Sequence, residues 1–393
     1  MRHLLESSLV ISGRGALCSL GASVPEAARA LLAGETGVVE NPDWRGLPHL
    51  RGKLFAPAKW PGPERKLDRK LTRSSSRMTH MALFALQEAL AEAQLTPELL
   101  RQRRVIIIGG STAGSQSSAA EFISEFQRQE SAYPYCQQFL KTMGHTVVSH
   151  LAMALGSDVP VLGLSAACAT GAQALVLGAN LLASGSYDLA ICVGADELDP
   201  YTQMVFDNVG AASTLPPQQT PRPFDRGRDG IVLSEGAGVL ILEPEAQLRE
   251  RGVSAQLHLL GVAQHRAGEQ PTFNDRTAIT KVMRAALDDA GLAPADVGFV
   301  KAHATGTREG DAEEFAALDA LFCERALPVP VTSLKGHLGH ALAGSGPIEL
   351  ALLAEALRVG TLPETKHFVA HEVAGLKVSL SGEQRRPEAG VVL

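Results

Sequence analysis

The sequence has few cysteines, no long apolar run and no excess of basic residues. Its 393 residues include five cysteines, none in a CxxC pair, which argues for a reducing compartment and against structural zinc. No run approaches the roughly 18 apolar residues of a membrane-spanning helix, and the first twenty residues lack the apolar core of a secretory signal. The formal net charge of −6 gives no overall basic character for nucleic-acid binding. We therefore expect a cytoplasmic protein without nucleic-acid or membrane partners.

Short apolar runs and longer Ala- and Leu-rich stretches alternate along the chain. The runs are apolar at consecutive positions, which is typical of strands covered on both faces. They are residues 9–11, 105–108, 159–164, 189–193, 239–242, 257–262, 297–300, 329–331 and 376–380. Helical stretches between them include 81–93, 172–182 and 348–357. This alternation predicts an α/β architecture with mainly parallel sheets.

The composition also suggests how the chain is divided. Residues 172–182 are small and apolar nearly all round, which predicts a central helix without a solvent face. Segments of about 20–104 and 113–158 are richer in charge and aromatics, and we expect them to form a cap on the core. The pattern breaks near residues 243–255, so we expect an N-terminal half over 1–250 and a C-terminal half over 251–393.

A glycine-rich segment follows the first predicted strand. Gly13, Arg14 and Gly15 begin a dinucleotide-binding pattern, but Cys18 stands where that pattern needs its third small residue. No acidic residue clearly serves a ribose. We therefore interpret the segment as a turn rather than a nucleotide site.

Cys168 lies in LGLSAACATGAQAL, between an apolar strand and the all-apolar helix. At a helix N-terminus, the unpaired N–H groups and the positive end of the dipole favour the thiolate. Small neighbours leave room for a substrate. The alternative is a buried structural cysteine, which we accept for Cys18, Cys192 and Cys323. For Cys168, the residues alone leave nucleophile and structural thiol both open.

A second group of polar residues lies in KAHATGTREGDAEE, after another predicted strand. His303 stands at the carboxyl end of that strand, where α/β proteins place catalytic groups. Thr305 and Thr307 are expected to expose hydroxyls that could hydrogen-bond a polar substrate arm. Glu313 and Glu314 begin a helix, where carboxylates suit the dipole.

A third group lies in SLKGHLGHALAGSGPIEL, which again predicts strand, turn and helix. Lys335, His337 and His340 precede the small-residue run 341–346. Because the two histidines are three residues apart, a metal pair is one interpretation. No suitably spaced third ligand is evident, and the small residues favour close packing instead.

One thiol and two imidazoles, each at the head of a helix that follows a strand, suit carbon–carbon chemistry on thioesters. A cysteine protease would need one histidine as base and an orienting partner. Two histidine donors that face one cysteine are better suited to stabilising an enolate oxygen.

In these segments the sequence resembles the elongating β-ketoacyl-[acyl-carrier-protein] synthases of the thiolase superfamily. The matching residues are Cys168 in AACATGAQAL, His303 in AHATGTREGD with Glu314, and Lys335 with His340 in a K-x3-GH segment. Segments 221–243 and 68–83 also match, and the likeness covers essentially the whole chain. The resemblance implies the thiolase fold. In it, two similar halves, each with a mixed five-stranded sheet, form α-β-α-β-α layers with a helical and loop cap, and the protein works as a dimer.

The resemblance also implies a reaction. Cys168 would take an acyl group from an acyl carrier protein, its backbone N–H helping to form an oxyanion hole. Malonyl carrier protein would then lose carbon dioxide, and His303 and His340 would donate hydrogen bonds from Nε2 to the enolate oxygen. The carbanion would attack the acyl-cysteine and release a 3-oxoacyl product.

The remaining roles follow from the same resemblance. Lys335 and Glu314 would form an orienting ion pair, and Thr305 and Thr307 would hold the pantetheine arm. No bound cofactor or metal is expected, since the carrier's phosphopantetheine carries the substrates. A basic patch for the acyl carrier protein is expected at Arg65, Lys66, Arg69, Lys70 and Arg73.

The chain departs from the family pattern at several positions. Ala304 and Ala343 stand where glycine is usual, and His337 is an additional imidazole. After residue 393 the family normally continues into a strand and a Gly-Phe-Gly-Gly loop, whose Phe gates the site and whose backbone supplies a second oxyanion donor. Either the chain is truncated or this element is supplied differently, so we expect the C-terminal half to lack its last strand and this loop.

Two functions from different classes remain open. The first is a condensing enzyme of fatty-acid, polyketide or aryl-polyene type, working as a homodimer or heterodimer. The second is a non-catalytic subunit like the chain-length factors that pair with ketosynthases. Such subunits typically lack the nucleophilic cysteine, whereas this chain has Cys168, His303 and His340 together. Thiolases and initiating synthases fit less well, because they pair cysteine with one histidine and another Cys or Asn.

Overall fold

The computed structural model describes residues 8–128, 138–156, 158–255, 257–265, 275–372, 378–381 and 384. Its larger sheet has the strand order β5-β4-β6-β7-β1-β8. These strands are β1 (Leu9–Leu17), β4 (Val105–Gly110), β5 (Val161–Gly163), β6 (Leu189–Asp196), β7 (Gly236–Pro244) and β8 (His258–Leu259). A smaller sheet has the order β11-β10-β9, with β9 (Val300–Lys301), β10 (Val329–Thr332) and β11 (Val378–Leu380). A two-stranded sheet pairs β2 (Val39–Glu40) with β3 (Leu54–Phe55).

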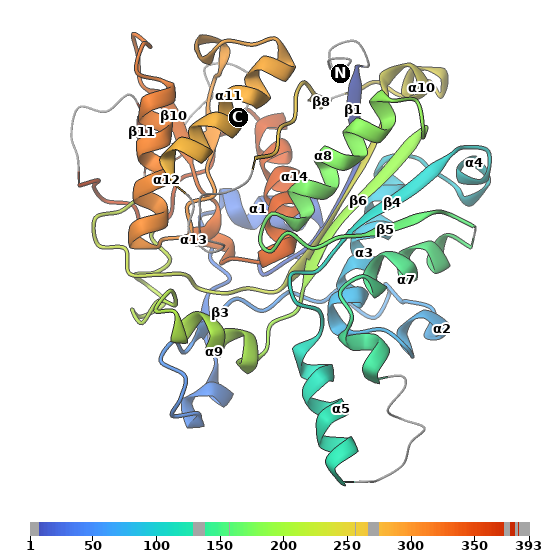
Figure 1. Cartoon of the computed structure of the whole chain (residues 1–393), viewed down its shortest axis with the longest axis horizontal. Helices are drawn as coiled ribbons and strands as arrows, with labels where there is room; N and C mark the ends of the chain where they lie inside the picture. Colours follow the sequence, from blue (N-terminus) through green and yellow to red (C-terminus); the bar gives the residue numbers. More distant parts are fainter. Residues whose placement is uncertain are drawn as a thin grey trace.

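The helices and sheets form five layers (Figure 1). Helices α3 (Arg77–Glu92) and α7 (Thr146–Leu155) cover one face of the larger sheet. Helices α8 (Thr170–Ala183) and α14 (Ser345–Arg358) cover its other face. The smaller sheet follows, and α11 (Arg276–Ala290) and α12 (Arg308–Leu321) lie beyond it. This order is the predicted α-β-α-β-α layering.

The remaining elements are short or lie at the edges of these layers. They are α1 (Val24–Leu32), α2 (Arg69–Thr72), α4 (Pro97–Arg101), α5 (Gln116–Arg128), α9 (Pro200–Asn208), α10 (Glu245–Glu250), α13 (Lys335–Leu338) and the 3-10 turns η2 (Pro42–Gly46), η3 (Pro294–Asp296) and η4 (Leu342–Gly344).

The strand directions correct one prediction. Only β5, β4 and β6 of the larger sheet run parallel, whereas β6, β7, β1 and β8 pair antiparallel. The continuous apolar runs of β1 and β7 suggested parallel strands, but they have another cause. Both strands have helices on both faces, so every side chain is covered whatever the strand direction.

The N-terminal region departs from a simple cap. Helix α3, within the segment predicted as cap, packs directly against β1 and β7 and contributes to the core of the larger sheet. The division of the chain at residue 250 stays a prediction, and residues 385–393, with the expected loss of the last strand and loop, lie outside the described residues.

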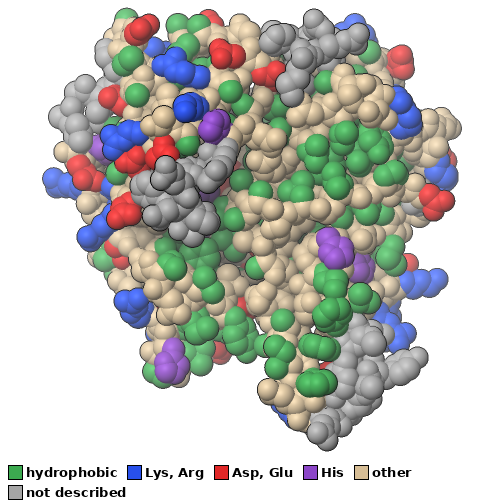
Figure 2. All heavy atoms as spheres, viewed as in Figure 1, with side chains coloured by type: hydrophobic (Ala, Val, Ile, Leu, Met, Phe, Trp, Pro, Cys, Tyr) green, Lys and Arg blue, Asp and Glu red, His purple; other side chains and the backbone are tan. Residues whose placement is uncertain are grey.

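Helix α8 is less enclosed than its sequence predicted. Its inner side packs on β4, β6 and α14. Leu175, Val176 and Leu177 are only half-buried, although Leu175 and Leu177 also pack against the core, and hydrophobic side chains gather over this helix in Figure 2. A helix that is apolar all round is expected to be covered on every side, so the half-buried residues leave apolar surface that is open to a partner.

Glycines let two helix N-termini meet at the centre of the molecule. A Cβ atom on Gly194 of β6 would lie 2.0 Å from the carbonyl oxygen of Ala343. A Cβ atom on Gly171 of α8 would lie 2.6 Å from the same oxygen and 2.4 Å from Cδ of Pro347. The segment before α14 therefore packs against the first turn of α8, which brings the segments containing Cys168 and His340 together.

We predict that Gly194→Ala is strongly destabilising. The added methyl group must displace backbone atoms, and overpacking of this kind lowers the free energy of unfolding by about 1–3 kcal/mol. Gly346→Ala is the matched control, since its Cβ would meet nothing closer than 3.4 Å. Urea unfolding of both variants checks the prediction. Equal stability of the two variants would show that the close approach is not a constraint.

Candidate active site

Cys168 lies on a tight turn between β5 and α8. Ala167 before it has a positive φ of 50°, a strained conformation for a residue with a side chain. The Thr170 hydroxyl holds the turn, accepting from Ala166 N at 2.8 Å and donating to Ala167 O at 2.7 Å. The turn thus places Cys168 directly before α8, as the sequence predicted.

Apolar side chains surround this thiol. Ile231, Leu233 and Leu342 form a small buried cluster, and Cys168, Leu198, Phe206 and Ala211 pack against it. The sulfur is therefore next to apolar surface suited to a hydrocarbon chain.

His340 is the imidazole closest to the thiol. Its Nε2 lies 3.1 Å from Cys168 Sγ, and its Nδ1 lies 2.9 Å from the Ser345 hydroxyl. The backbone of His340 is also fixed, because its N–H donates to Val232 O and its carbonyl accepts from Ser234 N. The ring is almost completely buried.

His303 completes the group from the smaller sheet. It follows β9, and its ring centroid lies 5.1 Å from that of His340 at an angle of 82°. No ring hydrogen bond of His303 occurs among the described residues, and the side chain is exposed to solvent. The structure thus brings together the three residues that the sequence singled out from three separate segments.

Glu314 and Lys335 do not form the predicted ion pair. Both carboxylate oxygens of Glu314 accept backbone hydrogen bonds, from His303 N and Ala304 N at 2.7 Å each. Lys335 Nζ instead donates to Glu349 Oε1 at 2.7 Å. The physical reason is that Glu314 already serves the N–H groups of the loop that carries His303.

Glu349 binds a second lysine. Its other oxygen, Oε2, pairs with Lys301, while its side chain and that of Lys335 are almost fully buried. This carboxylate was not predicted from the sequence. Its signal was a single acidic residue in the apolar stretch PIELALL, which predicts a buried and paired charge.

Asp196 is a second missed residue. It ends β6 and accepts hydrogen bonds from Ser111 Oγ, Thr112 N and Ala343 N, the last at 2.8 Å. Burial raises the pKa of this carboxyl to about 6. Asp196 therefore links the ends of β4 and β6 to the segment that follows His340.

Burial dominates the protonation states of the catalytic candidates. It raises the pKa of the Cys168 thiol to about 11, although the charge of Lys335 opposes the shift. Burial therefore outweighs the effect of the helix N-terminus, and the thiol is favoured over the predicted thiolate. Burial and the Lys335 charge lower the pKa of His340 to about 3. His303 keeps solvent-accessible surface, but desolvation by the protein atoms around its ring, together with the same charge, lowers its pKa well below the usual value. Both imidazoles are neutral at pH 7.

The threonines lie on the loop between His303 and α12. Thr307 is half-buried, but Thr305 is buried rather than exposed as predicted. Their hydroxyl oxygens lie 3.2 Å apart. Asp311 explains the burial, because it accepts from Gly306 N and Phe224 N and so holds the loop against the neighbouring segment.

His337 does not join the site. Its Nδ1 faces Glu35 O at 2.7 Å and its Nε2 faces Glu364 O at 3.3 Å, whereas His340 faces Cys168. The two rings therefore do not converge on a metal. Within the described ranges, no group of three His, Cys, Asp or Glu side chains could hold a metal ion.

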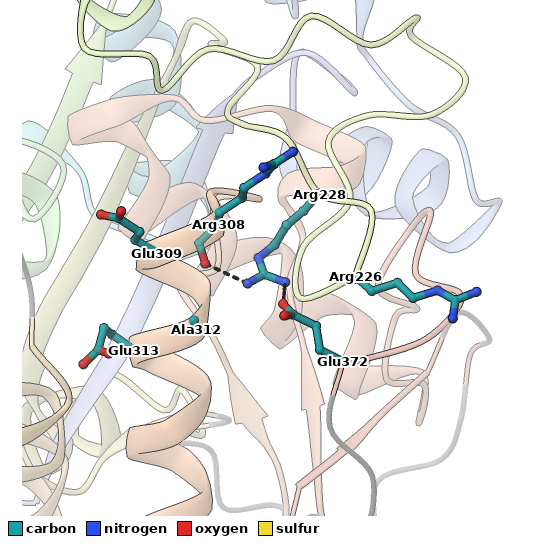
Figure 3. A pocket seen from close by; sticks show the side chains of 7 residues that line it. All are labelled: Arg226, Arg228, Arg308, Glu309, Ala312, Glu313 and Glu372. Carbon is teal, nitrogen blue, oxygen red and sulfur yellow. Dashed lines mark hydrogen bonds and ion pairs between the residues drawn. The ribbon is translucent and has the colours of Figure 1, made fainter.

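A pocket of about 700 Å³ lies elsewhere, at the first turns of α12 (Figure 3). It is lined by Arg226, Arg228, Arg308, Glu309, Ala312, Glu313 and Glu372. Figure 3 shows the Arg228 guanidinium directed at Glu372 and at the carbonyl of Arg308. Arg228 also donates to Thr307 O, so it supports the threonine loop from outside.

Comparison with known proteins identifies the family. The family described as beta-ketoacyl synthase, N-terminal domain, matches residues 6–247, and its C-terminal domain matches residues 255–369. The chain belongs to the β-ketoacyl synthase family. The resemblance found in the sequence, and the thiolase-type fold that it implies, are confirmed.

Relatives of this β-ketoacyl synthase include enzymes of different pathways. It is 30% identical to 3-oxoacyl-[acyl-carrier-protein] synthase 2 of Staphylococcus aureus, over 92% of this chain and 90% of the relative. It is 29% identical to the tetracenomycin polyketide synthase ketoacyl synthase alpha subunit of Streptomyces glaucescens, over 93% and 88%. A solved β-ketoacyl synthase from Burkholderia phymatum superposes with a TM-score of 0.89 at 30% identity, over 97% of this chain and 93% of that one.

We predict that Lys335→Met slows alkylation of Cys168 at pH 8, because Lys335 is the cation that lowers the pKa of this thiol. Lys301→Met is the matched control, since it removes the other partner of Glu349 and leaves Lys335 in place. Iodoacetamide labelling, followed by mass spectrometry of the Cys168 peptide, measures both rates. Equal slowing in the two variants would contradict a direct effect of Lys335 on the thiol.

Proposed function

We propose that this β-ketoacyl synthase is a 3-oxoacyl-[acyl-carrier-protein] synthase that condenses an acyl group on Cys168 with malonyl carrier protein. The observation that carries the proposal is the 3.1 Å contact between Cys168 Sγ and His340 Nε2, with His303 beside it. One nucleophile and two neutral imidazoles meet in an apolar surrounding, as decarboxylative condensation of thioesters requires.

The first half-reaction is acyl transfer. Cys168 Sγ attacks the thioester carbonyl of the acyl carrier protein, a carbon–sulfur bond forms, and the bond to the pantetheine sulfur breaks. The thiol proton passes to the departing sulfur. The apolar cluster around Cys168 then holds the acyl chain, while the backbone N–H of Cys168 stabilises the oxyanion.

The second half-reaction forms the carbon–carbon bond. Malonyl carrier protein loses carbon dioxide, and His303 and His340 donate N–H groups to the enolate oxygen. The carbanion attacks the acyl carbonyl on Cys168, and the carbon–sulfur bond breaks to release the 3-oxoacyl product. The cysteine sulfur then takes up a proton. Neutral imidazoles suit this role because they donate a hydrogen bond without giving up the proton.

The charged pairs around the site orient these groups. Glu314 holds the loop of His303 through its backbone, and Lys335 with Glu349 fixes the segment before His340. We assign Thr305 and Thr307 to the pantetheine arm. No bound cofactor enters the reaction, since the carrier's phosphopantetheine delivers both substrates.

An acyl carrier protein is the proposed partner, and part of the predicted basic patch is available to it. Lys66, Arg69, Lys70 and Arg73 are exposed on and around α2. Arg65 is not, because its guanidinium donates to Ala22 O and Phe84 O and lies over the Phe84 ring. The exposed cations complement an acidic carrier.

A second subunit is the other proposed partner, either another copy or a chain-length-factor-like chain. β5 is an edge strand whose Val161 and Leu162 are each 41% exposed. It lies beside the uncovered apolar face of α8, so an edge-to-edge dimer would cover both. Figure 2 shows further hydrophobic side chains over α5 and α9.

We place the protein in the cytoplasm. Among the described residues, Cys18, Cys168, Cys192 and Cys323 are free thiols, which suits a reducing compartment. No helix in the described part of the chain is long and apolar enough to cross a membrane.

The test of the proposed function is the intact mass of the protein after incubation with an acyl carrier protein bearing a medium-length chain. We predict a gain of one acyl group, and no gain in Cys168→Ala. This variant should still decarboxylate malonyl carrier protein in part, because both imidazoles remain. Cys323→Ala, which removes an exposed thiol, is the matched control and should acylate normally. Acylation of Cys168→Ala would overturn the nucleophile assignment, and no acylation of the unaltered protein would favour a non-catalytic subunit.

Removing either imidazole should affect the two half-reactions to different extents. We predict that His303→Ala and His340→Ala each reduce decarboxylation by about 10²–10³-fold, the usual effect of removing one donor to a developing oxyanion. Acylation of Cys168 should fall less. Carbon dioxide release and intact mass measure the two steps separately. Equal losses in both steps would count against the division of roles.

A further inference from the structure

Because His340 is neutral, its imidazole carries one proton, on either Nδ1 or Nε2. The position of this proton decides what faces Cys168. With the proton on Nε2, the ring presents a donor toward the sulfur, and with the proton on Nδ1 it presents a lone pair.

The partner of Nδ1 is the hydroxyl of Ser345, the first residue of α14. The Oγ–Nδ1 distance is 2.9 Å, and both residues are almost completely buried. Among the described residues, Ser345 Oγ makes this one hydrogen bond and no other. The hydroxyl can either donate to Nδ1 or accept from it.

The two arrangements differ in whether every buried polar hydrogen has an acceptor. If Nδ1 carried the proton, the Ser345 hydroxyl would have to accept, and its own hydrogen would be buried without an acceptor. If the hydroxyl donates, both polar groups are satisfied, and the imidazole proton is on Nε2. A buried polar hydrogen without a partner destabilises a protein, so the second arrangement is favoured.

We propose that Ser345 is a positioning residue, whose hydroxyl donates to Nδ1 of His340 and holds the imidazole proton on Nε2, where it faces the sulfur of Cys168. This placement follows from the contacts of the neutral ring and does not depend on the reaction. The further step rests on the proposed function: once Cys168 carries an acyl group, the same N–H is free to donate to the enolate oxygen of the second substrate. One tautomer then serves both half-reactions.

The first experiment reads the tautomer directly, without any substrate. Protein labelled with ¹⁵N-histidine is compared with Ser345→Ala and Ser345→Thr by NMR, and the His340 signals are assigned from their loss in His340→Asn. The unaltered protein and Ser345→Thr should show a protonated Nε2 and a bare Nδ1. Ser345→Ala should shift toward protonated Nδ1. A protonated Nδ1 in the unaltered protein, or no change in Ser345→Ala, would overturn the proposal.

The second experiment tests the consequence for the reaction. Ser345→Ala should lower decarboxylation of malonyl carrier protein about tenfold, the lower end of the effect seen when the hydrogen-bond partner behind a metal-bound histidine is removed, while acyl transfer to Cys168 falls less. Ser345→Thr keeps the hydroxyl and should restore most of the decarboxylation. Equal loss of both steps at an unchanged melting temperature would reduce Ser345 to a packing residue and overturn the proposal.

The two experiments separate this proposal from the proposed function. If the unaltered protein neither acylates nor decarboxylates, the proposed function fails, and the NMR comparison still decides where the imidazole proton lies.

Discussion

The close approach of two helix N-termini is the constraint on which the site depends. The first turn of α8 and the segment before α14 meet with only glycine hydrogens between them, at Gly171 and Gly194. Any side chain there would separate the two segments, and His340 would move away from Cys168. The two residues are 172 positions apart in sequence, so this packing of backbone on backbone is what converts two distant turns into one catalytic centre.

Buried and half-buried carboxylates hold the loops around this contact. Asp196 binds Ala343 beyond His340, Glu314 binds the backbone at His303, and Asp311 binds the threonine loop. Each accepts from backbone N–H groups that would otherwise be unpaired in a loop without regular structure. Such loops cannot satisfy their own hydrogen bonds, so the site relies on acidic side chains from neighbouring elements to keep its shape.

Much of the fold and the three central residues could be predicted from the sequence. Apolar runs marked most strands of both sheets, and the setting of Cys168 between a strand and an apolar helix marked its turn. Strand direction could not be predicted, because β1 and β7 are buried on both faces whether parallel or antiparallel. The predicted ion pair between Lys335 and Glu314 was wrong for a similar reason. Helix α12 begins at Arg308, so Glu314 lies in its middle and does not begin it as predicted. Only the three-dimensional packing shows that Glu314 is occupied by backbone donors and that Glu349 of α14 faces Lys335. Ser345 gave no sequence signal, since a serine at a helix start is ordinarily a capping residue.

The burial of both acids and bases around one site has a consequence for proton binding. Asp196 and Asp311, with pKa values of about 6 and about 7, bind protons in the folded chain at a pH where an unfolded chain does not. Their contribution to stability is present below the pKa of an unfolded aspartate and is lost as the pH rises through 6 and 7. His337 and His340, with pKa values of about 4 and about 3, act in the opposite sense, since an unfolded histidine takes up its proton first, near pH 6.5. Between about pH 4 and pH 6.5 the carboxyls favour the folded chain as the solution becomes more acidic, while the imidazoles favour the unfolded one. The two kinds of group thereby offset each other, and the proton balance of folding is partly compensated within the protein.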